Sequence, residues 1–306
     1  MAEPATRIAY SGEPGAFAED AVLAAFPRSA PVPVPGFREV FEVVTAGHLA
    51  GEAPALAPIV AGVVPIENLV NGTVRETYDL LLAHDLAIVG EVVVPVRLCL
   101  AALPGQSIAE IERVYSHIQA LGQAEAFLRT RPWTLLTTYN TAGAAKMIVE
   151  RGERAAAAVV SPRAAAAFGL EVLANDIQQV PDNRTRFLVI ARHGARPVSQ
   201  VPASGVISAS GAIGASGAEP EPMRTTMVLA VRNEPGSLYR CLGVFARAGL
   251  NLSKLESRPS HDRAWEYVFW VDLDADEAEA ARVATELSAD AARVRVLGTY
   301  ARAPEE

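Results

Sequence analysis

The sequence predicts an α/β protein made of two folded parts, and three observations support this fold class. Strand-length apolar segments alternate with helical patterns over residues 6–192. Residues 193–223 are rich in Gly, Ala, Ser and Pro, which predicts a flexible linker because such a segment buries too little apolar surface to order itself. Residues 224–302 follow the order strand, helix, strand, strand, helix, strand (βαββαβ), which predicts a ferredoxin-like module.

The first part opens with a predicted strand at Ile8–Tyr10. It leads into the loop Gly12–Phe17 and then into a helix that runs through Phe26. The apolar run Val60–Ile66 predicts a second strand. Thr73–Glu76 matches a capping box, in which the side chains at both ends satisfy free backbone groups, so we expect a helix to start there.

The remainder of the first part continues this alternation. Leu86–Leu103 is rich in strand-forming residues, and Pro95 predicts a break or an edge within it. Further strands are predicted at residues 114–115, 134–138, 155–160 and 187–190, and helices from Ser116 to about Arg131, over Thr141–Val149 (stopped by Gly152) and from Ser161 to Gly169. This order implies mostly parallel sheets, which place their chemistry at the carboxyl ends of strands or between two lobes.

The second part is shorter and contains four predicted strands and two predicted helices. Its strands are predicted at Thr226–Val231, Leu250–Ser257, Trp265–Asp272 and Val294–Tyr300. The first helix places Leu238, Leu242 and Phe245 on one face, and the second runs over Glu277–Leu287.

Composition excludes several classes of function. The net charge of −8 argues against nucleic acid as a partner, because no basic excess is present to neutralise phosphates. Cys99 and Cys241 both lie in apolar segments and are expected to be buried and reduced, as in a cytoplasmic protein. No secretory signal and no membrane-spanning run is expected.

Three short segments place polar residues next to predicted strand ends. Glu67-Asn68 follows an apolar strand, where a carboxylate can act as an acid or base or can simply belong to a turn. In the second segment, Ser116 and Gln119 fit a capping box at a helix start, which is also a seat for a carboxylate. Gln123 lies four residues after Gln119 and faces the same side of the helix.

His117, within this second segment, is expected to be a structural or substrate contact and not a metal ligand, because no second His or Cys falls at ligand spacing. The third segment is Thr185-Arg186-Phe187, where a hydroxyl and a cation precede a short strand. This pair suits a small anionic substrate that gains or loses a proton. No glycine-rich nucleotide-binding pattern occurs, so no organic cofactor is expected.

Taken in order, these segments resemble prephenate dehydratase. The matching segments are Ile8–Phe17, Gly62–Asn68 with Gly72 and Val74, Ile88–Glu91, Tyr115–Leu121, Thr141–Ala145 and Thr185–Phe187. The second part resembles an ACT domain through Asn233–Leu238 and Glu256–Pro259. The resemblance covers nearly the whole chain except the linker.

The resemblance implies a two-lobed, periplasmic-binding-protein type II-like catalytic domain with its site in the cleft, followed by an ACT regulatory domain. The family converts prephenate to phenylpyruvate, carbon dioxide and water in phenylalanine biosynthesis, without a metal or organic cofactor. Its ACT domain binds L-phenylalanine between subunits and inhibits the enzyme. A homodimer or homotetramer is therefore expected.

The resemblance also implies roles for individual residues. Thr185 is expected to assist the departing hydroxyl group, and Glu67 either handles protons or orders its loop. Arg186 either balances substrate charge or fixes the loop, and Phe187 forms wall or core. Polar substrate contacts are expected from Asn68, Ser116, His117, Gln119, Gln123 and Thr141. L-Phenylalanine is expected to contact Asn233, Pro235, Gly236, Ser237, Leu238, Glu256, Ser257, Arg258 and Pro259.

The chain departs from the family pattern at three places. Leu69 stands where the family often has Ser, Ile118 stands where it often has Pro, and residues 48–61 are an Ala/Pro-rich insertion expected to form a surface loop. Two other functions remain as alternatives: a dehydratase acting on arogenate, and a non-catalytic amino-acid sensor. The intact Thr185 disfavours a non-aromatising decarboxylase.

Overall fold

The computed structural model describes residues 6–52, 56–195, 222–259 and 267–304. The chain forms two compact units. The first comprises the chain up to Asp85 together with Val92–Leu188, and the second comprises Leu86–Glu91 together with the chain from Val189. Most of the expected linker, residues 196–221, lies outside the described residues.

The first lobe of the first unit is built on parallel strands. Strand β1 (Arg7–Ser11) pairs in parallel with β2 (Ala30–Val34) on one side and with β3 (Ile59–Asn68) on the other. The helices of this lobe are α1 (Phe17–Ala25), α2 (Phe37–Ala46) and α3 (Arg75–Ala83), and the short β4 (Gly72–Thr73) pairs with β3. The full order of this sheet is β2-β1-β3-β11-β5, where β5 is Leu86–Pro95 and β11 is Arg184–Arg192.

The second lobe contains a five-stranded sheet with the order β10-β6-β9-β7-β8. Its strands are β6 (Cys99–Ala102), β7 (Arg113–Ser116), β8 (Thr134–Thr137), β9 (Ala156–Val160) and β10 (Glu171–Ala174). Its helices are η1 (Ile108–Glu110), α4 (Ile118–Gln123), α5 (Glu125–Leu128), α6 (Thr141–Arg151) and α7 (Pro162–Ala167).

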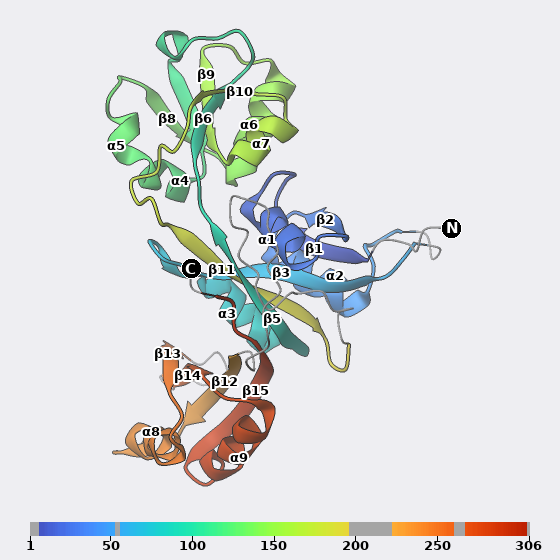
Figure 1. Ribbon diagram of the computed structural model, residues 1–306, viewed down its shortest axis with the longest axis vertical. Coiled ribbons are helices and arrows are strands. Elements are labelled where there is room, and N and C mark those ends of the chain that lie inside the picture. Colours follow the sequence, from blue (N-terminus) through green and yellow to red (C-terminus); the bar gives the residue numbers. More distant parts are fainter. Residues whose placement is uncertain (1–5, 53–55, 196–221, 260–266, 305–306) are drawn as a thin grey trace, which may run out of the picture. The chain divides into compact units, whose positions relative to one another are not determined.

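Helices cover both faces of this second sheet. Alternate residues of β9 enter two separate cores, Ala157 and Val159 on one face and Ala158 and Val160 on the other. Helices α4 and α5 pack on the first core and α6 and α7 on the second, as Figure 1 shows. Strands β7, β8 and β9 are mutually parallel, so their carboxyl ends lie at one edge.

The second unit contains the predicted βαββαβ module. Strands β12 (Met223–Val231), β13 (Leu252–Pro259), β14 (Tyr267–Leu273) and β15 (Ala291–Ala301) form an antiparallel sheet with the order β13-β14-β12-β15. Helices α8 (Ser237–Ala248) and α9 (Glu277–Leu287) share one apolar core with this sheet. The predicted order of elements is confirmed.

Two of the predicted helix caps are wrong. Thr73 belongs to β4 and pairs with Glu67, so α3 begins one residue later, after Val74. Ser116 ends β7 with no exposed surface, and the cap of α4 is His117. The predicted caps at Ser161 and Gly152 are confirmed, because Ser161 accepts a hydrogen bond from the Ala164 backbone and Gly152 takes the left-handed conformation that ends α6.

Candidate active site

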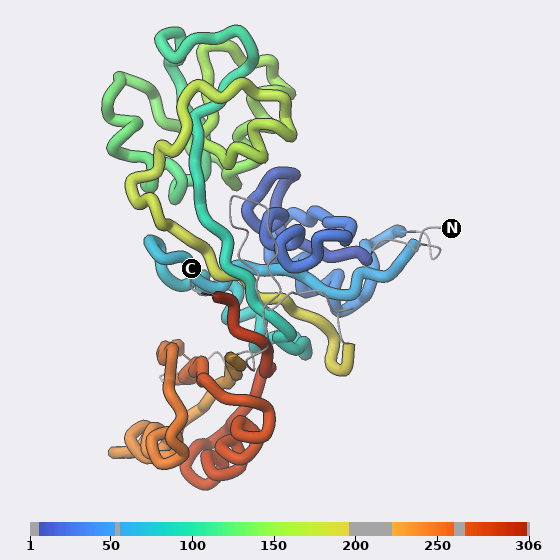
Figure 2. The backbone as a smooth tube through the Cα atoms, in the orientation of Figure 1, coloured from blue at the N-terminus to red at the C-terminus, as the bar shows by residue number. Residues whose placement is uncertain are grey.

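The chain passes twice between the two lobes of the first unit, as Figure 2 shows. The first crossing follows β5 and the second precedes β11, and the two crossings bond to each other. Val96 donates its backbone N–H to the Asn183 carbonyl over 2.7 Å, and the Ile177 N–H donates to the Leu98 carbonyl over 3.0 Å. The residues just before Thr185 are therefore held at the junction of the lobes.

Asn68 lies at the centre of a buried amide network. Its Oδ1 accepts hydrogen bonds from the backbone N–H groups of Val70 (3.0 Å) and Asn71 (2.9 Å). This fixes the orientation of the amide, so that Nδ2 faces the other way. Nδ2 donates to Asn183 Oδ1 at 2.9 Å and to Thr185 Oγ1 at 3.0 Å.

This contact defines what the Thr185 hydroxyl can do. Because its oxygen accepts a hydrogen bond from the Asn68 amide, its own proton is directed elsewhere. An N–H donor also favours partial negative charge on that oxygen and so makes the hydroxyl a better proton donor. The pair Asn68–Thr185 is suited to hydrogen-bonding or protonating a departing oxygen.

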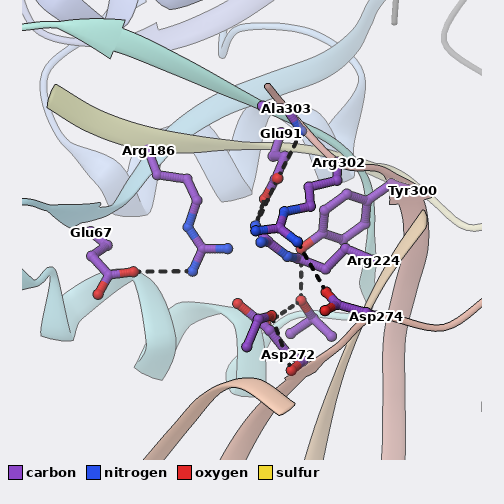
Figure 3. Close-up of polar contacts among 11 residues, drawn as sticks. Glu67, Glu91, Arg186, Arg224, Asp272, Asp274, Tyr300, Arg302 and Ala303 are labelled. Carbon is purple, nitrogen blue, oxygen red and sulfur yellow. Dashed lines mark hydrogen bonds and ion pairs between the residues drawn. The ribbon is translucent and has the colours of Figure 1, made fainter. Parts of the chain in front are cut away.

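Glu67 and Arg186 form an ion pair next to this network. Arg186 donates from Nη2 to the Glu67 carboxylate over 3.2 Å, with the two side chains 14% and 38% exposed. Figure 3 shows the contact. Glu67 precedes Asn68 and Arg186 follows Thr185, and neighbouring residues of a strand point to opposite faces. The side chains of the Glu67–Arg186 ion pair therefore point away from the Asn68–Thr185 contact. This supports the interpretation that Glu67 and Arg186 order the loop.

A cavity of about 330 Å³ lies beside Asn183. Its walls are lined mainly by side-chain amides, from Asn71, Gln119, Gln123, Gln178, Gln179 and Asn183, together with Val70, Gly122 and Val180. Gln119 and Gln123 thus reach one cavity, which lies along one side of α4. Gln178, Gln179 and Asn183 belong to the second crossing and are absent from the sequence-based set of contacts. Nothing in their local pattern distinguished them from a polar loop.

The cavity carries no charged lining residue in the described part of the chain. Side-chain amide N–H groups donate hydrogen bonds to anionic oxygen atoms. Amide groups can also donate to or accept from a ligand depending on their rotation. The cavity is therefore suited to a small oxygen-rich ligand.

The other predicted contacts of this segment have different placements. The Ser116 hydroxyl is fully buried and donates to the Val159 carbonyl over 2.6 Å, which supports a structural role. His117 accepts from the Gln119 N–H at Nδ1, and burial lowers the pKa of its imidazole. Because Nδ1 accepts this hydrogen bond, the neutral imidazole of His117 carries its proton on Nε2.

Phe187 is 3% exposed and packs in the core, so its place as a substrate contact is not supported. The two departures from the family pattern are surface side chains: Leu69 is 70% exposed and Ile118 is 61% exposed. Neither replaces a buried contact. The insertion is tied to β1 by an ion pair between Arg7 and Glu52, and residues 53–55 within it lie outside the described residues.

Thr141 begins α6, behind the cap Asn140, next to a contact between the lobes. Glu13 of the first lobe accepts hydrogen bonds from the Tyr139 hydroxyl (2.8 Å) and from Lys146 Nζ (3.0 Å). Burial and the Glu13 contact raise the pKa of Tyr139 to about 12, so this phenol remains a donor. Thr141 thus lies beside the contact between the lobes and does not line the amide cavity.

Gly15 permits a close approach of the two lobes. Its carbonyl accepts from the Ser161 hydroxyl over 2.7 Å, its φ is +82°, and a Cβ placed on it would lie 2.3 Å from the Ala164 Cα. The obstacle is backbone and cannot rotate away. Only glycine fits here.

Gly15→Ala is expected to lower both kcat and the free energy of unfolding, the latter by more than the roughly 1–2 kcal/mol of left-handed strain alone. The matched control is Gly105→Ala, because Gly105 has a similar φ of +74° but nothing within 4 Å of its Cβ position. Denaturant unfolding of both variants tests this. Equal destabilisation would mean that the contact with Ala164 does not matter.

The second unit has a cavity of about 410 Å³ at the start of α8. It is lined by Val231, Arg232, Asn233, Glu234, Gly236, Ser237, Leu238, Tyr239, Tyr267 and Phe269. Four of the predicted effector contacts line this cavity: Asn233, Gly236, Ser237 and Leu238. Pro235 and Glu256–Pro259 do not line it. The sequence analysis did not predict Tyr267 and Phe269 of β14 as contacts.

The register of β13 nevertheless places part of the predicted segment on the cavity side. Ser257 pairs with Phe269 and Pro259 pairs with Tyr267, and side chains directly opposite in an antiparallel pair share a face. Glu256 and Arg258 consequently point to the other face. Ser257 and Pro259 are the better-placed members of this segment.

The described residues contain no group of three His, Cys, Asp or Glu side chains that could hold a metal ion. None of the described helices has the length and apolar character required to cross a membrane. Cys99 and Cys241 are buried and unpaired, and burial raises the pKa of both thiols.

Comparisons with known proteins follow the same division of the chain. A family model described as prephenate dehydratase matches residues 8–195, and one described as ACT domain matches residues 225–289. The arogenate dehydratase/prephenate dehydratase 2 of Arabidopsis thaliana, a chloroplastic protein, is 37% identical over 305 residues, which cover 96% of this chain and 72% of that protein.

Two solved structures resemble the whole chain. The prephenate dehydratase of Arthrobacter aurescens in complex with L-Phe is 29% identical with a TM-score of 0.81, and the match covers 98% of this chain and 92% of the other. GqqA, described as a novel type of quorum quenching acylase, is 29% identical with a TM-score of 0.79, covering 97% and 98%. The predicted fold class is confirmed.

Proposed function

Because the chain belongs to the prephenate dehydratase family, we propose that it converts prephenate to phenylpyruvate with release of carbon dioxide and water. Loss of carbon dioxide moves electrons through the ring and expels the hydroxyl group, and formation of the aromatic ring drives the reaction. The protein has to bind two carboxylates and supply a proton or hydrogen bond to the departing oxygen.

The contact between Asn68 and Thr185 carries this proposal. The Asn68 amide donates a hydrogen bond to the Thr185 hydroxyl oxygen, so the proton of that hydroxyl is available to the departing group. An aligned donor of this kind contributes roughly 100- to 1000-fold in rate. The neighbouring amide cavity, with Gln119 and Gln123 on one side of α4, is the proposed binding site for substrate oxygen atoms.

Each of the other predicted site residues has a proposed role. Glu67 and Arg186 order the strand ends that carry Asn68 and Thr185. His117 caps α4 and so supports Gln119. Thr141 belongs to the contact between the lobes and not to the amide cavity.

A second substrate, arogenate, differs from prephenate by an ammonium group in place of the ketone. No carboxylate lines the amide cavity among the described residues. A desolvated ammonium without a carboxylate partner is unfavourable. We therefore place prephenate ahead of arogenate, although the Arabidopsis relative is named for both.

An acylase activity, as named for GqqA, is less well supported. The hydroxyl of an acylase nucleophile needs a base as its partner, whereas Thr185 contacts the amide of Asn68, which is not basic. A purely sensory role is disfavoured by the same contact, because binding alone does not require an oriented proton donor.

The direct experiment supplies the purified protein with prephenate and, separately, with arogenate, and identifies the products. Phenylpyruvate from prephenate is the expected result, with slower or no formation of phenylalanine from arogenate. Absence of product from both substrates would contradict the dehydratase proposal, and hydrolysis of an acyl-homoserine lactone instead would favour the acylase.

L-Phenylalanine is the proposed inhibitor, bound in the cavity at the start of α8. The N–H groups of this helix start suit the effector's carboxylate, and Tyr267 and Phe269 suit its ring. The complex of the Arthrobacter relative with L-Phe supports this choice. We further propose that the C-terminal module assembles around the effector, as a homodimer or a homotetramer.

L-Phenylalanine is expected to lower the turnover of prephenate and to raise the melting temperature. Tyr267→Ala is expected to raise the inhibitory concentration about tenfold, because it removes an aromatic contact. Val296→Ala is the control, since Val296 is also partly exposed but lies on β15, which β12 separates from β14. Inhibition that is equally strong in both variants would exclude this cavity as the effector site.

The proposed domain limits are residues 6–192 for the catalytic domain, 193–223 for the linker and 224–302 for the ACT domain. The family matches at residues 8–195 and 225–289 support them. A cytoplasmic location is proposed as well, because two buried, unpaired cysteines suit a reducing compartment.

A further inference from the structure

Asn183 contains a buried hydrogen-bond donor that the protein leaves unused. The residue is 1% exposed, and its Nδ2 has no acceptor within hydrogen-bond distance among the described residues. Leaving such a donor unpaired costs on the order of 1–3 kcal/mol. Unsatisfied groups of this kind are rare in folded proteins and require an explanation.

The orientation of this amide follows from its neighbour. Asn183 Oδ1 accepts from Asn68 Nδ2 over 2.9 Å, and Asn68 is itself oriented by the two backbone N–H groups that its Oδ1 accepts. Turning the Asn183 amide over would set two N–H donors against each other. Its Nδ2 therefore faces away from Asn68.

The backbone of Asn183 is equally constrained. Its carbonyl accepts from Val96 on the other crossing, and its N–H donates to the Val180 carbonyl over 3.3 Å. The unpaired donor is thus held in place before any ligand arrives, which is the condition for electrostatic stabilisation of a transition state.

Two features place Asn183 beside the proposed reaction centre. Asn183 is one of the residues that line the amide cavity. It also shares Asn68 with Thr185: Asn183 Oδ1 and Thr185 Oγ1 both lie within hydrogen-bond distance of the same nitrogen, at 2.9 and 3.0 Å. Two donors, one hydroxyl and one amide, are therefore arranged around Asn68.

We propose that Asn183 is a further catalytic residue, whose Nδ2–H group donates a hydrogen bond to the departing hydroxyl oxygen of the substrate beside Thr185. This inference rests on the proposed dehydratase function. As the carbon–oxygen bond breaks, negative charge grows on that oxygen. Thr185 supplies the proton that converts the departing hydroxide to water, and solvent returns a proton to its oxygen after the products leave. Asn183 supplies a fixed N–H dipole, whose contact with the departing oxygen strengthens as the charge develops.

The test is Asn183→Asp, which keeps the shape and the acceptor for Asn68 but exchanges the N–H donor for a carboxylate. At neutral pH we expect kcat to fall about 100-fold. KM is expected to rise as well, because the new carboxylate repels an anionic substrate. Lowering the pH should raise the kcat of this variant at least tenfold, because the protonated carboxyl group again offers a hydrogen-bond donor. Wild-type protein should show no such gain.

The matched control is Asn71→Asp. Asn71 lines the same cavity but is exposed, and only its backbone contacts Asn68, so the same charge enters the cavity without the loss of the fixed donor. We expect this variant to raise KM and to leave kcat within threefold. If Asn183→Asp behaves like Asn71→Asp, or shows no recovery at low pH, the proposal is wrong.

A second variant covers the case in which Asn183→Asp does not fold, judged by its thermal unfolding. Asn183→Ala removes the donor without adding charge, and kcat is expected to fall at least tenfold with KM little changed. An unchanged kcat would overturn the proposal. Turnover by wild-type protein is measured in parallel: its absence refutes the dehydratase function itself, whereas normal wild-type turnover with unaffected Asn183 variants refutes only this inference.

Discussion

Thr185→Ala is expected to lower kcat for prephenate by about 100- to 1000-fold, with KM changing less than threefold. The hydroxyl matters only as the carbon–oxygen bond breaks, so its loss affects the transition state more than the bound substrate. Steady-state kinetics with purified protein measures both constants. The result would identify the Asn68–Thr185 contact as the proton-donating element of the site.

Two controls accompany this variant. Thr185→Ser keeps the hydroxyl and the contact with Asn68, and should retain most of the activity. Thr138→Ala removes a half-buried hydroxyl that bonds to the Asn140 carbonyl in the second lobe, and should lower kcat far less than Thr185→Ala. Similar losses in Thr138→Ala and Thr185→Ala would assign the effect to general destabilisation.

Glu91→Ala is expected to destabilise the second unit by about 3–5 kcal/mol, because it leaves a charge buried without a partner. Arg224 is 7% exposed, and its Nη1 donates to both carboxylate oxygens of Glu91, at 2.7 and 2.8 Å. The Glu91 carboxylate also accepts from the Ala303 N–H over 2.9 Å, as Figure 3 shows. Chemical unfolding, followed by circular dichroism, measures the change.

The comparison for this prediction is an exposed ion pair. Arg97 and Asp176 are 62% and 59% exposed, so Asp176→Ala should change stability by less than about 1 kcal/mol. Replacing Glu91 and Arg224 together with apolar residues should recover part of the loss, since no unpaired charge then remains. If Glu91→Ala were no more destabilising than Asp176→Ala, the buried pair would contribute little.

The pair also explains how the second unit is assembled. Glu91 ends a six-residue piece of β5 that clusters with the C-terminal module, and Arg224 is the second residue of β12. In the same unit, a Cβ on Gly298 would lie 1.9 Å from the Ile88 carbonyl oxygen, so β15 approaches this piece at backbone distance. Neither contact is visible in the sequence, because the partners are more than a hundred residues apart.

The candidate site shows how far local patterns reach. Thr185, Asn68, Gln119 and Gln123 were all singled out from short motifs, and the structure joins the first two by a hydrogen bond and places the other two in one cavity. Ser116 belonged to an equally good motif, yet its hydroxyl is turned into the sheet. A sequence motif can identify a candidate hydroxyl group, but the group that forms a hydrogen bond with it lies on another strand.

Asn183, Gln178 and Gln179 illustrate the reverse case. They belong to a loop whose composition resembles any polar turn, and only the pairing of the two crossings places them beside α4. The strand β2 was missed for a related reason, since Pro31 and Pro33 argue against a strand. They are tolerated because β2 lies at the edge of its sheet and pairs only with β1.

The sequence by itself determined the α/β class, the order of the C-terminal elements and the helix ends at Gly152 and Ser161, because these depend on hydrophobic periodicity and on the conformations of single residues. The tertiary structure decided which polar groups remain available. Asn68, far away in the chain, donates hydrogen bonds to the Thr185 hydroxyl oxygen and to Asn183 Oδ1. The hydroxyl proton of Thr185 and the Nδ2 donor of Asn183 therefore remain available, within the part of the chain that the structure describes. Such availability depends on burial and on distant partners, which local patterns do not encode.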